Sequence, residues 1–492
     1  MNKKAFYIIT GILIVAIIAV IGVWYAFKKG VVSNSIKSFT NYSTNVEAGL
    51  VGSSILGSAT NNSISVNTLA EKGMETTIDY GTKAGSYNSK TAVHKSEQGE
   101  PIVTDITGLK ANTKYYYRVN YKKATDSSYT NGTEHSFYTQ RASGSTFSFG
   151  VQGDSHPERA GKMFNSDLYT LTMKNAFGLQ PDLYYTLGDD FSIEGLIGKN
   201  QNTQSAVDQV YLLQRKFLDV VGSVASVYLG NGNHEQAAKY LLDGTANSFP
   251  VLAAKARNNF YPLPSPSSFF GGDTQKVENV VYVKDYYSYE WGDALFITID
   301  PYWHSDAAVD NSANSDKKTG DLWNNTLGDE QYQWFKKTLE NSHAKYKFVF
   351  THHVLGTGRG GIEEARLYEW GGYNKSGVWE FDKKRPGWEL PIHQLMVKNG
   401  VAIFFQGHDH LFAKQELDGI IYQEVPNPAD NTYTAFNKDA YQSGETLPNS
   451  GFLNVTVSPE QVKVDYIRSF LPGDESGTNK NGTVGYSYTV KK

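Results

Sequence analysis

Short apolar runs alternate with amphipathic segments over most of the chain from Thr146 onward. The runs are β-prone and end in turn residues, a pattern typical of buried strands. They cover residues 147–152, 183–187, 226–229, 347–351 and 401–406. Helical periodicity marks residues 166–177, 205–220 and 329–341, and in the last of these Trp334, Phe335 and Leu339 share one face. The alternation of strands and helices predicts an α/β fold.

Shorter β-prone runs without helices between them occupy the preceding part of the chain. They cover residues 63–69, 75–80, 102–106, 115–122 and 135–139, and turn clusters separate them. Their regular spacing predicts a small β-sandwich within residues 51–141. Residues 452–457 and 461–467 predict two antiparallel strands near the end. An insertion at 237–285 contains the proline-rich residues 261–266, which predict an irregular loop.

The N-terminal residues have the pattern of a membrane anchor. Residues 5–27 carry no charged side chain, and as a helix they would be roughly 35 Å long, enough to cross a bilayer. Lysines flank both ends, and aromatic residues lie at both predicted interfaces. We expect a transmembrane helix within residues 1–29, followed by a flexible stalk of Ser, Asn, Thr and Gly at 30–50. A cleaved signal peptide is the alternative, although residues 23–26 are a poor cleavage site.

Composition excludes several classes of protein. The chain has 492 residues, which indicates two or more domains. It has 0 cysteines, so disulfides, thiolate zinc sites and cysteine nucleophiles are excluded. The net charge is −4 and the pI about 6.3, so no basic face indicates a nucleic-acid partner.

Five polar motifs lie where predicted strands end. They are Gly153-Asp154-Ser155-His156, Gly188-Asp189-Asp190, Gly232-Asn233-His234-Glu235, Thr351-His352-His353 and Gly407-His408-Asp409-His410. Loops at the carboxyl ends of strands converge on one crevice in an α/β sheet. Carboxylate, amide and imidazole groups are donors that divalent metals prefer. In extended chain, residues two apart project to one side, as in Asp154-x-His156 and His408-x-His410. We therefore expect one crevice with enough ligands for two metal ions.

In their order and composition, these motifs resemble the calcineurin-like metallophosphoesterase superfamily. The resemblance covers residues 146–492 and implies a four-layer α/β (α+β) sandwich of two central sheets flanked by helices. Residues 109–119 resemble the tyrosine corner of fibronectin type III domains and of the N-terminal domain of purple acid phosphatases. In such a corner the Tyr115 hydroxyl would bond back to the backbone near Leu109. This places an all-β sandwich before the catalytic domain.

The resemblance also implies roles for single residues. Metal one would be held by Asp154, His156, Asp189 and His410. Metal two would be held by Asp189, Asn233, His352 and His408. Asp189 would bridge the ions, and His234 would give a proton to the leaving oxygen. The ions would be manganese, zinc or iron. Ser192 stands where purple acid phosphatases have an iron-binding tyrosine, so we expect a colourless enzyme.

The remaining expectations concern the substrate. His353, Arg359 and Arg366 are candidate substrate-binding residues, whereas Glu235 and Asp409 are expected to orient imidazole rings. The predicted function is hydrolysis of small phosphate esters, with monoesters favoured, by a site outside the cell membrane. The alternatives are a phosphodiesterase on the same site, or a surface binding protein without activity. If the signal peptide were cleaved, the protein would be secreted.

Overall fold

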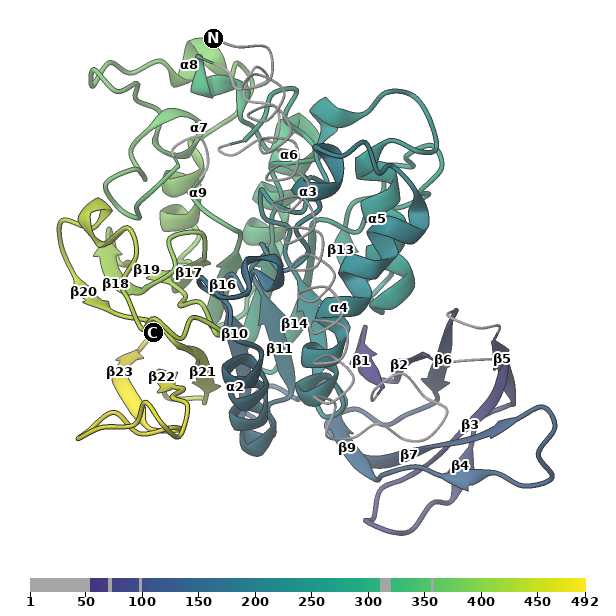
Figure 1. Cartoon of the computed structure of the whole chain (residues 1–492). Coiled ribbons are helices and arrows are strands. Elements are labelled where there is room, and N and C mark those ends of the chain that lie inside the picture. The colour runs from purple at the N-terminus through teal and green to yellow at the C-terminus, as the bar shows by residue number, and fades with distance from the viewer. Residues whose placement is uncertain (1–53, 70–72, 97–99, 310–319, 355–357) are drawn as a thin grey trace, which may run out of the picture. The chain divides into compact units, whose positions relative to one another are not determined.

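The larger of two central sheets holds the first three motif strands. The computed structural model describes residues 54–69, 73–96, 100–309, 320–354 and 358–492. Within them this sheet has nine strands in the order β23-β22-β21-β10-β11-β12-β1-β2-β6 (Figure 1). The strands are β1 (Ile55–Gly57), β2 (Ser63–Leu69), β6 (Pro101–Thr107), β10 (Phe147–Gln152), β11 (Leu183–Thr186), β12 (Ser226–Leu229), β21 (Gly451–Val457), β22 (Val462–Arg468) and β23 (Val484–Val490). β10, β11, β12 and β1 are parallel, so the ends of the motif strands lie at one edge.

The second central sheet holds the other two motif strands. Its order is β13-β14-β15-β16-β17-β19-β18-β20. The strands are β13 (Gly271–Gly272), β14 (Tyr287–Trp291), β15 (Ala294–Thr298), β16 (Tyr346–Phe350), β17 (Ile403–Gln406), β18 (Phe412–Leu417), β19 (Ile420–Glu424) and β20 (Glu445–Leu447). β15, β16, β17 and β19 are parallel, which brings the ends of β16 and β17 together.

Aromatic side chains fill the space between the two sheets. Tyr185 of β11 stacks on Phe350 of β16 with ring centroids 4.2 Å apart. Phe149 of β10 meets Phe296 of β15 edge to face at 5.1 Å. These rings are fully buried, and such pairs add about 0.5–1.5 kcal/mol each beyond the burial of their apolar area. The core thus fixes the two sheets, and the loops at their edges, against each other.

Helices cover the outer faces of both sheets (Figure 1). The α-helices are α2 (Ser166–Leu179), α3 (Glu194–Ile197), α4 (Gln204–Gly222), α5 (Phe249–Phe260), α6 (Gly328–Asn341), α7 (Tyr368–Gly371), α8 (Phe381–Lys384) and α9 (Ile392–Lys398). Short 3-10 turns are η1 (Pro157–Arg159), η2 (Lys239–Leu241), η4 (Leu322–Asn324) and η5 (Lys438–Ala440). α2 and α4 pack on the first sheet, while α6 and α9 join a core with strands of the second. The expected α/β sandwich of two sheets flanked by helices is confirmed.

The N-terminal β-region shares a sheet with the catalytic region. Its own sheet contains β3 (Met74–Gly81), β4 (Ser89–Lys90), β5 (His94–Ser96), β7 (Lys114–Lys123), β8 (Thr130–Asn131) and β9 (His135–Tyr138). Its other strands, β1, β2 and β6, extend the nine-stranded sheet, where Leu56 pairs with Ser226. Hydrophobic alternation predicts which face of these strands is buried, but it does not predict their partner strand.

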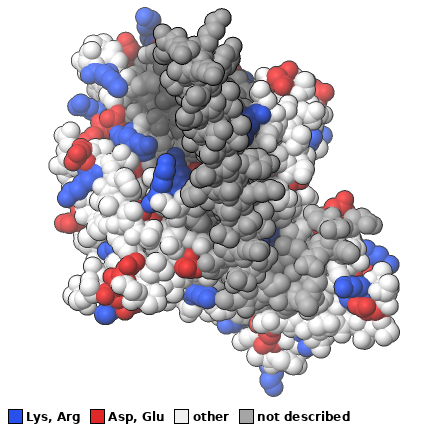
Figure 2. All heavy atoms as spheres, in the orientation of Figure 1, with Lys and Arg blue, Asp and Glu red and all other residues white. Residues whose placement is uncertain are grey.

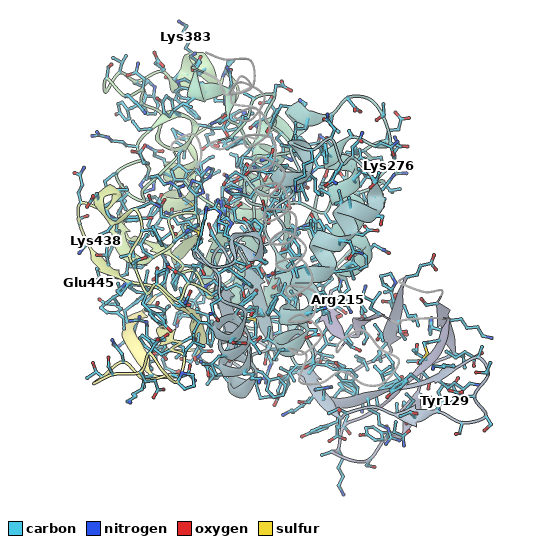
Figure 3. The ribbon with its side chains drawn as sticks, viewed as in Figure 1. Tyr129, Arg215, Lys276, Lys383, Lys438 and Glu445 are labelled. Atoms are coloured by element: carbon cyan, nitrogen blue, oxygen red, sulfur yellow. The ribbon has the colours of Figure 1, made fainter. Side chains whose placement is uncertain are left out.

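Two side chains reinforce this shared sheet. Arg215 of α4, labelled in Figure 3, donates to the carbonyl oxygens of Asn67 on β2 (2.7 Å) and of Phe260 on α5 (2.5 Å). The Tyr117 hydroxyl donates to the Ser223 carbonyl at 2.8 Å. Its neighbour Tyr115 accepts from the Lys110 N–H at 3.0 Å, next to the residue expected for a tyrosine corner.

Several elements were not predicted from the sequence, among them the strands β1, β14, β18 and β19 and the helices α3, α7, α8 and α9. The insertion at 237–285 contains α5, which was not predicted, although residues 261–266 are irregular as expected. A third C-terminal strand, β23, pairs with β22. The predicted anchor at 1–29 and stalk at 30–50 lie outside the described residues. No helix in the described part of the chain has the length and apolarity to span a bilayer.

Candidate metal centre and active site

The five motif loops meet at the ends of β10, β11, β12, β16 and β17. Four ligand candidates have left-handed backbone conformations: His156 (φ 49°), Asp189 (φ 58°), His408 (φ 81°) and His410 (φ 55°). Such conformations are uncommon for residues other than glycine and concentrate at functional sites. The expectation that Asp154-x-His156 and His408-x-His410 are extended is therefore wrong, because His156, His408 and His410 all have positive φ.

Two glycines allow the loops after β11 and β12 to touch. A Cβ atom on Gly232 would lie 2.3 Å from the Asp189 Oδ1, and one on Gly188 (φ 100°) would lie 2.2 Å from the Gly232 nitrogen. Any side chain at these positions would push the two loops apart. The glycines of the two motifs are thus required by the close approach that brings Asp189 to Asn233.

Asp154, His156 and His410 form the first cluster of ligand atoms. The Nε2 atoms of His156 and His410 are 3.1 Å apart. The Asp154 Oδ2 lies 3.0 Å from the His410 Nε2 and 3.8 Å from the His156 Nε2. All three residues are buried. These are three of the four ligands that the resemblance implies for metal one.

The second cluster contains Asn233, His352 and His408. The His352 Nε2 lies 3.0 Å from the Asn233 Oδ1 and 3.0 Å from the His408 Nδ1. Asp189 lies between the clusters, because its Oδ2 is 3.2 Å from the His352 Nε2 and 3.6 Å from the His156 Nε2. The structure therefore brings together all seven metal-ligand candidates.

These spacings fit divalent cations. Ligand atoms bound at about 2.1 Å to one ion are roughly 3.0–3.4 Å apart in octahedral or tetrahedral geometry. Groups of carboxylate and imidazole atoms that lie within 4.8 Å of one another include Asp154 with His156 and His410, and Asp154 with Asp189, His352 and His408. The donor set suits manganese, zinc or iron(II), and a carboxylate positioned as Asp189 is can bridge two such ions.

The charge state of the cluster also suits cations. Burial opposes ionisation of Asp189, but nearby imidazoles hold its pKa well below the ordinary value. Burial lowers the pKa of His352, but the carboxylates of Asp189 and Asp154 outweigh this effect and raise it to about 10. Burial lowers the pKa of His156 to about 4, which leaves this ring neutral and able to coordinate. The buried carboxylates thus need positive partners, and without a metal the protonated His352 is one of them. A cation bound there would take the place of that proton.

Outer hydrogen bonds hold the ligands in place. The His156 Nδ1 lies 2.8 Å from the Glu158 Oε1, and the His352 Nδ1 lies 2.9 Å from the Leu187 carbonyl oxygen. Each bond directs the Nε2 of its ring into the cluster. The Oδ1 of Asp154 accepts from the His408 N–H at 2.8 Å, which leaves Oδ2 for the cluster. Partners of this kind fix the tautomer and orientation of metal ligands.

Within the described residues, the carboxylates of Glu235 and Asp409 accept hydrogen bonds from backbone N–H groups, Tyr441 and Arg359. That they orient imidazoles stays a prediction. The buried Glu235 carboxylate accepts four backbone N–H groups at 2.7–2.9 Å, from Asp189, Asp190, Phe191 and Gly232. It therefore shapes the ligand loops themselves. Asp409 accepts from the Gly360 N–H, from Tyr441 and from Arg359, and so holds the loop of residues 358–361 against the last motif.

His234 lies beside the cluster, and each of its ring nitrogens has a polar neighbour. Its Nδ1 is 2.8 Å from the Glu194 Oε2, and its Nε2 is 3.8 Å from the Asp189 Oδ2 and 3.0 Å from the Arg159 Nη2. Burial lowers the pKa of His234, but the carboxylates of Asp189 and Glu194 outweigh this effect and raise it to about 9. The Arg159 guanidinium can only donate, so the Nε2 accepts from it in this arrangement. Once the Nε2 is released from Arg159 and protonated, it would hold a proton for a leaving group near the cluster.

The three candidate substrate residues have different places. His353 is buried, with its ring 4.7 Å from that of His408. Arg359 donates to the His408 carbonyl and to Asp409, so its guanidinium supports the last motif loop. Arg366 lines a cavity of about 750 Å³ with Glu363, Lys375 and Gln442, and no metal-ligand candidate lines that cavity. The structure thus brings His353 and Arg359 to the site, but it does not bring Arg366 there.

Glu158, Arg159 and Glu194 were missed by sequence reasoning. Each is a charged residue within five positions of a motif ligand, on the short helices η1 and α3 that follow the first two motifs. That proximity was the available signal. It does not identify their partners, because Arg159 and Glu194 meet His234 only through the tertiary fold.

Comparison with known proteins agrees with the fold. The sequence model of the calcineurin-like phosphoesterase family matches residues 147–412. The structure of PhoD aligns with a TM-score of 0.61 and 15% identity over 90% of each chain. The purple acid phosphatase PPD1 from yellow lupin (Lupinus luteus) seeds aligns with a TM-score of 0.57 and 14% identity, over 89% of this chain and 74% of that chain. At these identities the two likenesses establish the fold alone.

No curated protein sequence matches the chain. The family match covers more than half of the chain, and it includes the five motif loops whose side chains converge in the structure. The protein therefore belongs to the calcineurin-like phosphoesterase family and is a metal-dependent phosphoester hydrolase.

Proposed function

We propose that the protein is a phosphomonoesterase that hydrolyses small phosphate esters outside the cell membrane. The observation that carries the chemistry is the position of His234. Its ring is held by Glu194 and lies beside the Asp189 carboxylate, which is shared by both ligand clusters. A proton donor next to a dinuclear site is what the departure of an alkoxide requires.

The chain's residues have separate roles in this reaction. Asp154, His156, Asp189 and His410 would hold one cation, and Asp189, Asn233, His352 and His408 the other. The bound cations supply charge neutralisation for the phosphoryl oxygens and a nucleophilic water at neutral pH. Glu194 orients the His234 ring through Nδ1, and the Nε2 of His234 gives its proton to the leaving oxygen. Burial of the ligands excludes bulk water from the carboxylates.

Two features support small monoesters over nucleic acids or other large diesters. The N-terminal β-sandwich resembles the arrangement of purple acid phosphatases. The net charge of −4 gives no basic surplus for binding a nucleic acid, and the Lys and Arg drawn in Figure 2 lie among Asp and Glu. The alternatives are a phosphodiesterase on the same site, or a binding protein without activity.

The location outside the membrane is part of the proposal. It rests on the uncharged residues 5–27 and on the serine- and asparagine-rich segment that follows. We expect the full chain to fractionate with membranes and to become soluble when residues 1–29 are removed. A mature chain that begins near residue 30 and is recovered from the medium would instead indicate a cleaved signal peptide.

One experiment separates the three functions. The full-length chain, purified in detergent and loaded with Mn²⁺, is assayed with 4-nitrophenyl phosphate and with bis(4-nitrophenyl) phosphate. The proposal predicts a higher kcat/KM for the monoester. A higher value for the diester would indicate a phosphodiesterase. Absence of turnover on both, with two metal ions bound per chain, would indicate the binding protein.

A further inference from the structure

Arg159 is a partly exposed cation at the edge of the buried ligand clusters. It ends the short turn η1, which begins directly after the ligand candidate His156. The left-handed conformation of His156 (φ 49°) turns the chain there. The Arg159 side chain is 30% exposed, whereas those of Asp154, His156 and Asp189 are 1–2% exposed. Arg159 therefore lies between the solvent and the clusters.

Apart from its hydrogen bond to His234, the guanidinium of Arg159 has only weak partners. Its Nη1 lies 3.3 Å from the Met163 sulfur, and its Nε lies 3.4 Å from the Glu158 Oε1. That carboxylate oxygen is already 2.8 Å from the His156 Nδ1. By contrast, Arg141 binds Asp182 through two short bonds of 2.6 and 2.9 Å. Arg159 thus keeps donor capacity for an anion.

The third neighbour of Arg159 relates it to the reaction. Its Nη2 donates to the His234 Nε2 at 3.0 Å, and this nitrogen can take the proton-donor role only when the guanidinium turns from it to another acceptor. A leaving oxygen that receives a proton from this nitrogen must come close to the guanidinium. The phosphoryl group bonded to that oxygen would come equally close, so its terminal oxygens lie within reach of the Arg159 N–H groups.

We propose that Arg159 binds a terminal phosphoryl oxygen of the substrate and thereby makes the site favour monoesters over diesters. This inference rests on the proposed function. A phosphomonoester has three terminal oxygens and up to two negative charges, whereas a diester has two terminal oxygens and one charge. If two cations engage two terminal oxygens, a monoester still has one for the guanidinium. Arginine forms strong, directed hydrogen bonds with phosphate.

The test compares Arg159→Gln with Arg118→Gln in the full-length chain loaded with Mn²⁺. Arg118 is a matched control because its side chain is 27% exposed and pairs with Asp79 on β3, in the N-terminal sheet. Metal content and the affinity for inorganic phosphate are measured first, the latter by calorimetry. Arg159→Gln is expected to keep both metals and to bind phosphate about 10- to 100-fold more weakly. Arg118→Gln is expected to bind phosphate as the unchanged protein does.

The same variants are then assayed on 4-nitrophenyl phosphate and bis(4-nitrophenyl) phosphate. Both esters lose 4-nitrophenolate, which leaves without a proton, so an indirect effect through His234 is small. We expect kcat/KM of Arg159→Gln to fall about 10- to 100-fold on the monoester and less than about threefold on the diester. Arg159→Lys should recover part of the loss on the monoester.

Three results would overturn the assignment. They are equal losses on the two esters, unchanged phosphate affinity, and loss of metal from Arg159→Gln, which would make Arg159 a support for the ligand loop. Failure of the proposed function is distinguishable from these. If the unchanged protein hydrolysed neither ester but bound phosphate through Arg159, the proposed phosphomonoesterase activity would be wrong. The proposal that Arg159 binds an anion would still hold.

Discussion

The Nδ1 of His234 lies 2.8 Å from the Oε2 of Glu194, a residue five positions after the ligand candidate Asp189. This contact links the loop after β11 to the loop after β12. It gives the imidazole one fixed orientation, with Nε2 directed toward the clusters of ligand atoms. The pair is therefore the most direct place to test the chemistry of the site.

Replacing His234 by Asn should reduce activity in proportion to how much the leaving group needs a proton. General acid catalysis contributes roughly 10²- to 10⁴-fold. We expect a loss of that size in kcat/KM for alkyl phosphates and a much smaller loss for esters of acidic phenols, with both metals retained. Equal losses on both substrate types would mean that His234 acts on the phosphoryl group instead. Loss of metal would mean that it is a ligand.

Replacing Glu194 by Gln should show the same substrate selectivity with a smaller effect. Gln can still hydrogen-bond to Nδ1, but it does not stabilise a protonated ring. We expect a loss of roughly 10- to 100-fold on alkyl phosphates. Because the two residues act as a unit, adding this change to His234→Asn should cause little further loss. The exposed Glu340→Gln on α6 is the control, and additive losses would contradict the coupling.

Replacing Asp189 by Ala should lower the occupancy of both metal sites. The Oδ2 of Asp189 is within 3.6 Å of ligand atoms from both clusters, so its loss affects both ions. Metal content per chain, measured by mass spectrometry, should fall well below two, while the exposed Asp167→Ala keeps both.

The iron-loaded protein should show no visible charge-transfer band, since Ser192 occupies the position of the iron-binding tyrosine. Unchanged metal content, or a purple colour, would contradict the assignment.

Replacing Glu235 by Gln should weaken both metal binding and the fold. The carboxylate accepts four backbone N–H groups, and an amide would direct N–H donors against some of them. A buried donor without an acceptor costs about 1–3 kcal/mol. We expect a free energy of unfolding lower by about 2 kcal/mol or more, and metal affinity about 10- to 100-fold weaker. Calorimetry with and without Mn²⁺ measures both, and an unchanged metal affinity would contradict a role in shaping the ligand loops.

His135 of β9 should make the N-terminal sheet sensitive to acid. Burial lowers the pKa of this histidine to about 4, so the folded protein holds the ring neutral. Its contribution to stability is present above the unfolded pKa of about 6.5 and is lost as the pH falls toward 4. We expect the melting temperature of His135→Gln to fall less between pH 7.5 and pH 4.5 than that of the unchanged protein. Parallel losses would contradict this effect.

Sequence patterns predicted the motif strands and the convergence of the ligand candidates for different physical reasons. Apolar runs such as 147–152 and 226–229 match β10 and β12, because strands buried on both faces are continuously apolar. The ligand candidates could be recognised because each motif places metal-binding residues at a strand end, in four of the five together with a glycine. The left-handed conformations of His156, His408 and His410 were missed, since they are set by the loops packed around them.

Contacts between distant segments could not be predicted from one sequence. Nothing local in Glu194 or Arg159 indicates that both meet His234. Helix α5 was missed because the prolines at 262–266 indicate an irregular loop, and that interpretation was extended to the whole insertion. The pairing of β1 with β12 depends on a register that hydrophobic alternation leaves open. Each of these features is decided by packing in three dimensions.

The pairing of Leu56 with Ser226 has a consequence during synthesis of the protein. β1 leaves the ribosome about 170 residues before its neighbour β12, a delay of roughly 10–30 s at the usual rates of translation. During that time β1 can pair with β2, but its other edge has no partner. An open edge can pair with a strand of another nascent chain. The sheet that later aligns Asn233 with the other ligands is therefore most exposed to misassembly before the catalytic residues have been made.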